Sequence, residues 1–120
     1  MFNDSNYLEA DKFYLKALQI DSNSIEAKYN LSNSQLNQGN NDIAIKGFNK
    51  ILDKTEDKKI LSKTHYNIGN AHVKKQEWEK AVDSFKNAIR NNPNDKDARY
   101  NYGYAKSKLA KEQDKKENKD

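Results

Sequence analysis

Hydrophobic residues recur at helical spacing in two successive segments of the chain. Between residues 78 and 89, successive apolar residues lie three, one, three, three and one positions apart, at Trp78, Ala81, Val82, Phe85, Ala88 and Ile89. These intervals place all of them on one stripe of an α-helix. Residues 65–72 show the same kind of stripe in His65, Ile68, Gly69 and His72. The pattern therefore predicts two amphipathic helices that pack against each other.

Small residues and a proline indicate how these two helices cross and where the second one ends. Gly69 and Ala81 are small at the expected crossing, which lets the two backbones approach closely. Pro93 follows the second stripe, where it cannot extend the helix. Asn94 or Asp95 can then cap the next helix. The segment reads as a helical hairpin followed by a further helix.

The spacing of these residues resembles that of the tetratricopeptide-repeat (TPR) family. Within a unit of about 34 residues, that family carries a Gly, an Ala and an aromatic residue four positions later, another Ala and a Pro. Gly69, Ala81, Phe85, Ala88 and Pro93 match this order and spacing. The resemblance implies a full repeat over residues 62–95 and an all-α fold built as an array of helix-turn-helix units.

Two further copies of the pattern precede this unit. Ala44 and Phe48 imply a repeat over residues 25–58, so about three additional residues, 59–61, separate the two full repeats. Ala10, Tyr14 and Ala17 imply the second helix of another repeat over residues 1–24. The first position of that repeat would lie ten residues before residue 1, so we expect its first helix to lie outside this sequence.

The end of the sequence predicts one more helix and a polar tail. Tyr100, Tyr102, Gly103 and Leu109 lie at helical spacing within residues 96–112, and Gly103 occupies the same repeat position as Gly69. We expect this segment to be a C-terminal capping helix that covers the last repeat. Residues 113–120 are almost wholly charged or amide-bearing, so we expect them to be disordered.

The missing first helix has a consequence for assembly. Leu8, Tyr14, Ala17 and Leu18 lack the helix that should cover part of them. An uncovered apolar stripe favours self-association, so we expect weak homodimerisation through residues 1–24.

Composition excludes several classes of protein. The sequence has no cysteine, so disulfides, cysteine-bound zinc and a thiol nucleophile are excluded. No apolar run approaches the roughly 18 residues of a membrane span, and no signal peptide is visible. The net charge is +4, but basic and acidic residues alternate, as in residues 74–77, so we expect no nucleic-acid patch. The mean hydropathy of −1.24 is compatible with a repeat array that buries apolar surface only between neighbours.

No motif indicates catalysis, a cofactor or a metal site. His65 and His72 lie seven residues apart, about 10 Å along a helix, too far to bind one metal ion together. The four glycines are isolated, so no phosphate-binding loop exists, and no serine lies in a nucleophile elbow. We expect a protein that binds other proteins and is not an enzyme.

A more specific resemblance is to the TPR protein of the bacterial Bat aerotolerance operon. It is carried by YNLSN at residues 29–33, HYNIGNAH at residues 65–72, the longer inter-repeat segment and NNPNDKDARYNYGYAK before a polar tail. The resemblance implies a scaffold in the cell envelope, on the periplasmic side of the cytoplasmic membrane, whose partners are membrane proteins with von Willebrand factor A domains. A cytosolic TPR adaptor or cochaperone is the alternative.

The TPR resemblance also implies a binding groove lined by the first helix of each repeat. The implied groove residues are Tyr29, Asn30, Asn33, Lys63, Tyr66, Asn67, Asn70, Lys74, Tyr100, Asn101 and Tyr104. Asparagine is a poor helix former, so its repeated use inside helices favours a role in binding peptide backbone. The alternative is that these tyrosines and asparagines pack neighbouring helices together. The carboxylate clamp of some TPR cochaperones is disfavoured, because only Lys63 matches its basic residues.

Overall fold

The computed structural model describes residues 4–118, which form six α-helices and no strand. The prediction of an all-helical fold is therefore confirmed for this part of the chain. The helices are α1 (Asp4–Ile20), α2 (Ile25–Asn37), α3 (Asn41–Leu52), α4 (Lys58–Lys74), α5 (Trp78–Asn91) and α6 (Lys96–Glu117). Within this range, no helix is both long and apolar enough to span a membrane.

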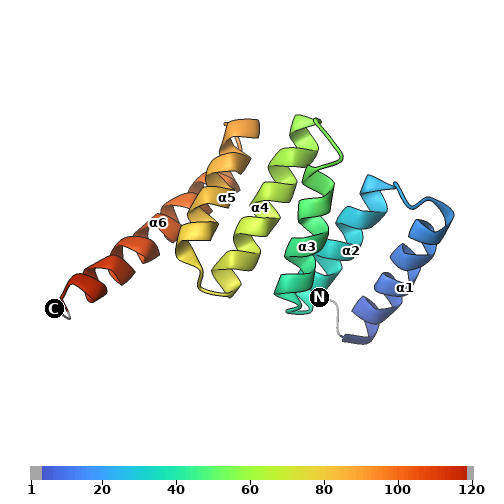
Figure 1. Ribbon diagram of the computed structural model, residues 1–120, viewed down its shortest axis with the longest axis horizontal. Helices are drawn as coiled ribbons and strands as arrows, with labels where there is room; N and C mark the ends of the chain where they lie inside the picture. Colours follow the sequence, from blue (N-terminus) through green and yellow to red (C-terminus); the bar gives the residue numbers. More distant parts are fainter. Residues whose placement is uncertain (1–3, 119–120) are drawn as a thin grey trace. The chain divides into compact units, whose positions relative to one another are not determined.

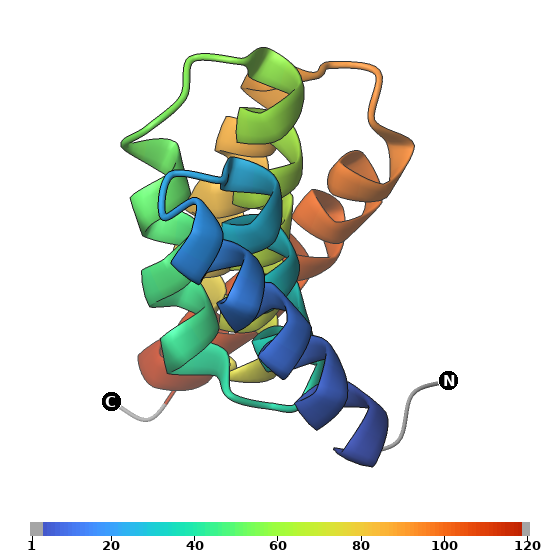
Figure 2. The ribbon, with the colours of Figure 1, turned by 90° about the vertical axis from the view of Figure 1, so that its right-hand side faces the viewer.

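The chain divides into two units, each made of three helices (Figure 1). The first unit contains α1, α2 and α3 and runs to Glu56; the second begins at Asp57 and contains α4, α5 and α6. Within each unit every helix packs against its neighbour in sequence, α1 on α2 and α2 on α3, then α4 on α5 and α5 on α6. Figure 2 turns the first unit so that α1 lies in front of α2 and α3.

The core of each unit is formed by the second helix of a hairpin. Ala44, Phe48 and Ile51 of α3 are completely buried. Ala81, Phe85 and Ala88 of α5 occupy the same repeat positions and are also completely buried. All three belong to the apolar stripe predicted from the sequence. Gly69 of α4 lies directly against the Phe85 ring, because a Cβ atom built on it would be 2.5 Å from Phe85 Cε1. The small residue is thus required by the close approach of α4 and α5.

Side-chain caps define the starts of three helices. Ser24 Oγ accepts a hydrogen bond from the Ala27 amide at the start of α2, at 3.1 Å. Asp57 Oδ1 accepts from two amides at the start of α4. Asp95 Oδ1 accepts from the Ala98 amide at 3.1 Å at the start of α6, so Asp95 is the cap. Each cap satisfies amide groups that have no partner within the helix.

The two hairpin turns have the same backbone conformation. Gly39 after α2 has φ +85°, and Gln76 after α4 has φ +58°. The residue after each, Asn40 or Glu77, donates its amide hydrogen bond back to the carbonyl five residues earlier, at 2.9 Å in both turns. This is the left-handed termination that usually carries glycine. The second turn therefore places a glutamine in a conformation that costs free energy for a residue with a Cβ atom.

The extra residues between the repeats lengthen a helix. Helix α4 has 17 residues, whereas the corresponding helix α2 has 13, and residues 59–61 lie in the first turn of α4. The segment between the repeats is thus partly helical, from the Asp57 cap onward.

The last helix is longer than the sequence pattern predicted. Residues 113–117 were expected to be disordered, but α6 continues through Glu117. Gln, Lys and Glu are good helix formers, and Lys116 Nζ lies 3.8 Å from Glu112 Oε1 one turn earlier. The expected disorder of residues 119 and 120 lies outside the described residues.

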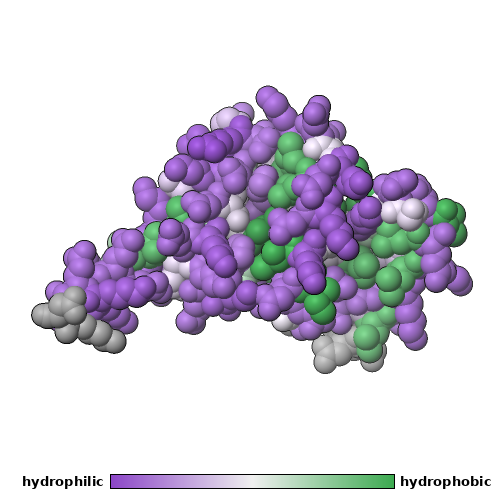
Figure 3. Space-filling view, in the orientation of Figure 1, coloured by the Kyte–Doolittle hydropathy of each residue, from purple (hydrophilic) through white to green (hydrophobic). Residues whose placement is uncertain are grey.

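Helix α1 carries exposed apolar side chains, which are visible over that helix in Figure 3. Its large exposed residues are Leu8, Phe13, Leu15 and Ile20. Of the four residues expected to be uncovered, Leu8 is exposed, whereas Tyr14, Ala17 and Leu18 are half-buried.

Candidate functional site

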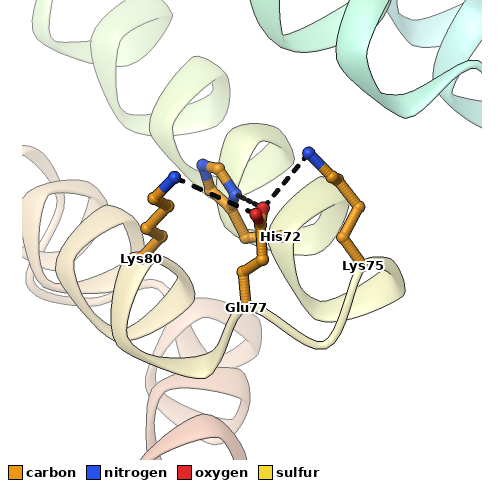
Figure 4. A network of polar contacts seen from close by, with 4 residues as sticks. All are labelled: His72, Lys75, Glu77 and Lys80. Carbon is orange, nitrogen blue, oxygen red and sulfur yellow. Dashed lines mark hydrogen bonds and ion pairs between the residues drawn. The ribbon is translucent and has the colours of Figure 1, made fainter.

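A network of polar contacts holds the turn between α4 and α5 (Figure 4). Glu77 Oε1 accepts a hydrogen bond from His72 Nδ1 at 2.9 Å and lies 3.3 Å from Lys75 Nζ. Lys80 Nζ lies 3.9 Å from the other carboxylate oxygen. The hydrogen bond from His72, aided by the two lysines, lowers the pKa of Glu77 below its ordinary value. These contacts fix the turn that precedes Trp78.

An aromatic and cationic cluster lies next to this turn, between α5 and α6. The rings of Trp78 and Tyr104 meet edge to face with their centroids 5.9 Å apart. Lys108 Nζ lies 5.7 Å from the Tyr104 centroid and 6.0 Å from the Trp78 centroid. An ammonium group at this distance is attracted by the electron-rich ring faces. This cluster was not predicted from the sequence, although Tyr104 and Lys108 are one helical turn apart.

A surface hollow of about 500 Å³ opens beside the cluster. Its lining consists of Gln76, Trp78 and five residues of α6, namely Lys108, Lys111, Glu112, Asp114 and Lys115. Helical spacing of three and four residues puts the three lysines on one face of α6. We call this surface the basic hollow. It combines an aromatic wall with three ammonium groups and two carboxylates, so its lining has a net charge of +1. The excess of ammonium groups suits a segment that carries both apolar and acidic side chains.

Trp78 also lines a second hollow, whose residues are mainly acidic. This hollow, of about 400 Å³, is lined by Gln76 and Trp78 together with Glu77, Glu79, Lys80, Asp83 and Glu112. Its ionisable residues are four acids and one lysine. Gln76, Trp78 and Glu112 belong to both hollows, so a partner's charge pattern can determine which of the two it occupies.

Three residues predicted to line a groove contact the core of their unit or are buried in it. Tyr29 meets Phe48 with ring centroids 5.7 Å apart, and Tyr66 meets Phe85 at 5.9 Å. Asn67 is 9% exposed, so its side chain is not accessible to a ligand in this structure. Tyr29 and Tyr66 thus make the same ring contact in the two repeats.

Asn101 joins α6 to α4 through its amide group. Asn101 Nδ2 donates to Asn70 Oδ1 at 3.0 Å and to Tyr66 Oη at 3.2 Å. Both hydrogens of this amide are therefore engaged within the second unit. Asn101, Tyr66 and Asn70 were all predicted to line the groove, and their hydrogen bonds connect α6 to α4.

The remaining predicted residues lie in separate places. Asn30 and Asn33 line a small hollow of about 70 Å³ between α1 and α2, together with Tyr7 and Tyr14. The side chains of Lys63 and Lys74 are exposed on α4, and those of Tyr100 and Tyr104 are exposed on α6. Of the whole predicted set, Tyr104 is the residue that lies in the cluster beside the basic hollow.

The histidines have structural surroundings. His65 is half-buried, and burial lowers its pKa below the ordinary value. His72 is hydrogen-bonded to Glu77, as described above. Among the described residues, no group of three or more His, Cys, Asp or Glu side chains is arranged to hold a metal ion.

Comparison with solved structures shows the fold. The structure of MamA matches with a TM-score of 0.78 and 22% identity, over 92% of this chain and 67% of that chain. The TPR2AB domain of yeast Sti1, in a complex with pHSP90, matches with a TM-score of 0.82 and 21% identity, over 90% and 43%. The first TPR domain of human RPAP3 matches with a TM-score of 0.81 and 18% identity, over 92% and 84%. The chain thus spans less than half of the Sti1 chain.

Comparison with families identifies the repeats themselves. No curated protein matches the chain. Two models of the tetratricopeptide repeat match it, one over residues 26–54 and the other over residues 62–95. These matches cover the helical hairpins α2–α3 and α4–α5, in which Phe48 and Phe85 form the cores. The chain therefore belongs to the tetratricopeptide-repeat family.

Proposed function

We propose that this protein is a non-catalytic interaction module that binds an acidic segment of another protein in the basic hollow. Membership of the TPR family supports a role in protein–protein interaction. The observation that carries the choice of site is the cluster of Trp78, Tyr104 and Lys108 at the edge of a hollow with two further lysines.

The lining of the hollow defines the chemistry of the partner. An apolar side chain of the partner can cover the exposed part of Trp78, while its carboxylates approach Lys108, Lys111 and Lys115. Exposed ion pairs contribute about 0.2–1 kcal/mol each, and covering an aromatic face contributes about 1–2 kcal/mol. A short isolated peptide is therefore expected to bind with a dissociation constant on the order of 1 mM or weaker, and added salt should weaken the binding further.

The single tryptophan of the chain makes this proposal directly testable. The probe is a synthetic peptide of Asp and Glu residues around one Leu, and the comparison is a peptide with the same Leu among Lys residues. Binding of the acidic peptide should shift the Trp78 fluorescence and weaken as NaCl is raised. The Lys-based peptide should produce no saturable shift.

Matched charge reversals locate the binding. The variant Lys108→Glu, Lys111→Glu, Lys115→Glu should abolish the fluorescence change. The control reverses three exposed lysines distant from Trp78 in sequence, Lys54, Lys58 and Lys59, and should retain it. Equal binding of both peptides, or undiminished binding by the first variant, would refute the proposed site.

The cellular setting is a finer proposal that the sequence resemblance alone supports. A Bat-type scaffold would bind von Willebrand A-domain membrane proteins at the periplasmic side of the cytoplasmic membrane. The test is a pull-down from membranes of an organism that carries this gene, with the intact chain and the Lys108, Lys111 and Lys115 variant in parallel. Recovery of such proteins by the intact chain alone would support the proposal, whereas their absence from both samples would contradict it.

The cochaperone alternative makes a different prediction. The yeast Sti1 neighbour is a complex with pHSP90, but this chain has Tyr29 and Tyr66 where the carboxylate clamp requires a lysine. Titration with an acidic heat-shock C-terminal peptide distinguishes the two. Submillimolar binding that is lost in a Lys63→Ala variant would favour the cochaperone reading.

A further inference from the structure

A hollow of about 280 Å³ lies on the first helical hairpin. It is lined by four residues of α2 between positions 28 and 35, four residues of α3 between positions 43 and 50, and Leu18 of α1. All of these residues belong to the first unit. The walls are therefore the two helices of one complete repeat. We call this surface the hairpin hollow.

Two small residues meet at the floor of the hairpin hollow. Ser32 is buried, and a Cβ atom built on Gly47 would clash with Ser32 Oγ. The two helices approach closely here, and neither side chain is large enough to fill the space beside the contact. Leu18, Leu31 and Ile43 add apolar surface to the lining, and Ile43 is 56% exposed. The floor and walls thus offer apolar surface that is open to water.

The charges that line the hairpin hollow are all positive. Among the described residues, three lysines and no acidic residue line it, so the lining has a net charge of +3. Lys46 and Lys50 lie one turn apart on α3, about 6 Å along the helix axis, and Lys28 lies on α2. The lining of the basic hollow, by comparison, has a net charge of +1. Carboxylates are therefore attracted to the hairpin hollow from both of its walls.

The second hairpin shows that the repeat fold does not require this combination. Its residues at the repeat positions of Lys28, Ile43, Lys46 and Lys50 are His65, Lys80, Asp83 and Asn87. With the histidine neutral, these four residues have no net charge, and a lysine replaces the exposed isoleucine. The small pair is kept in reverse order, as Gly69 and Ser84. Packing of the hairpin thus accounts for the small floor but not for the three lysines and Ile43.

We propose that the hairpin hollow is a second docking site, for a segment of a partner protein that inserts one large apolar side chain and carries carboxylates on both sides of it. A cavity of about 150 Å³ holds a benzene ring, so a hollow of about 280 Å³ admits a Phe or Leu side chain. The flanking carboxylates approach Lys28 on one wall and Lys46 and Lys50 on the other.

The size and exposure of the hairpin hollow favour a protein segment over a free small molecule. Small-molecule sites usually have volumes of about 300–1,000 Å³ and bury most of the ligand surface. The hairpin hollow is smaller, and Ile43, Lys46 and Lys50 at its edge are exposed. A protein segment needs to cover only one side chain here, because its other contacts lie outside the hollow.

The inference does not rest on the proposed function. The hairpin hollow and the basic hollow share no residue and lie in different units. Trp78 lies in the second unit, so its fluorescence does not report on the hairpin hollow. Amide NMR signals of the intact, ¹⁵N-labelled chain report on each site separately.

The probe is a synthetic peptide with one Phe between Glu residues. At millimolar peptide it should shift the amide signals of residues 28–35 and 43–50 in a saturable way, and the effect should weaken as NaCl is raised. A peptide with Ser in place of Phe and a peptide with Lys in place of Glu should not shift them. The titration is repeated with the Lys108→Glu, Lys111→Glu, Lys115→Glu variant, in which these shifts should persist.

A graft from the second hairpin tests the lining residues. The variant Ile43→Lys, Lys46→Asp, Lys50→Asn carries the residues that α5 has at the same repeat positions, so it should fold with unchanged helix content by circular dichroism. It should weaken peptide binding at residues 28–50 by about tenfold or more. Lys86→Asp changes the net charge by the same amount at an exposed site of α5, and it should leave that binding unchanged.

Three results would overturn the inference. The first is the absence of peptide-induced shifts at residues 28–35 and 43–50, and the second is undiminished binding by the grafted variant. The third is binding of octanoate, a small apolar carboxylate, at lower concentrations than the peptide, which would assign the hairpin hollow to a small molecule. Shifts confined to the surroundings of Trp78 that vanish in the Lys108, Lys111 and Lys115 variant would refute the hairpin hollow and leave the proposed function standing.

Discussion

Replacing Gly69 or Gly103 by alanine should change stability in opposite directions, although both glycines occupy the same repeat position. A Cβ atom on Gly69 would lie 2.5, 2.7 and 2.9 Å from three ring atoms of Phe85, which is completely buried and has no room to move. Overpacking of this kind costs about 1–3 kcal/mol, while the gain in helix propensity from Gly to Ala returns up to about 1 kcal/mol. The net expectation for Gly69→Ala is a loss of about 1–2 kcal/mol.

The same substitution at Gly103 meets no neighbour within 4 Å. Only the higher helix propensity of alanine acts at this position, so Gly103→Ala should raise the free energy of unfolding by about 0.5–1 kcal/mol. The assay is urea unfolding followed by circular dichroism, at protein concentrations low enough to keep the chain monomeric. A Phe85→Leu background provides the control, because removing the ring should reduce the cost of Gly69→Ala relative to that background. Equal effects of the two alanines, or no relief in the Phe85→Leu background, would refute the packing argument.

The turn and the pH dependence provide three further predictions. Gln76 and Gly39 both have positive φ, a conformation that favours glycine. Gln76→Gly should therefore stabilise the chain by about 0.5–1 kcal/mol, and Gly39→Ala should destabilise it by about 1 kcal/mol. Urea unfolding measures both changes. Thermal melting should occur at lower temperature as the pH falls below about 6.5, since burial lowers the pKa of His65 and the unfolded chain then binds the proton first. A second loss should follow below about pH 4.5, where the unfolded chain protonates Glu77 before the folded chain does, because the hydrogen bond from His72 lowers the folded pKa. Glu77→Gln should remove that second step from a plot of melting temperature against pH.

Much of the fold follows from residues that repeat at fixed spacing. Phe85 was predicted to lie on an apolar helix stripe, and Phe48 was predicted to occupy the same position of the preceding repeat. Both are completely buried. A small residue was predicted where the helices cross, and Gly69 lies against the Phe85 ring. These features were predictable because each depends on one helix stripe facing another. Local spacing in the sequence is sufficient to show such a stripe.

The candidate site was harder to predict because it depends on contacts between segments distant in sequence. Trp78 and Lys108 are thirty positions apart, and no local pattern indicates that they meet. The repeated asparagines have surroundings that their positions in the sequence did not indicate. Repetition at one position suggested a shared ligand, but Asn67 is buried and Asn101 hydrogen-bonds to Tyr66 and Asn70. Repetition in a TPR array marks packing positions as readily as binding positions.

The neighbour-to-neighbour packing inside each unit bears on how the chain folds. The main contacts join α1 to α2, α2 to α3, α4 to α5 and α5 to α6, helices that are consecutive in the chain. Short loops close with little loss of entropy, so proteins with such local contacts fold in microseconds to milliseconds. The first three helices can therefore assemble as soon as residue 56 has left the ribosome, while α4 to α6 are still being synthesised.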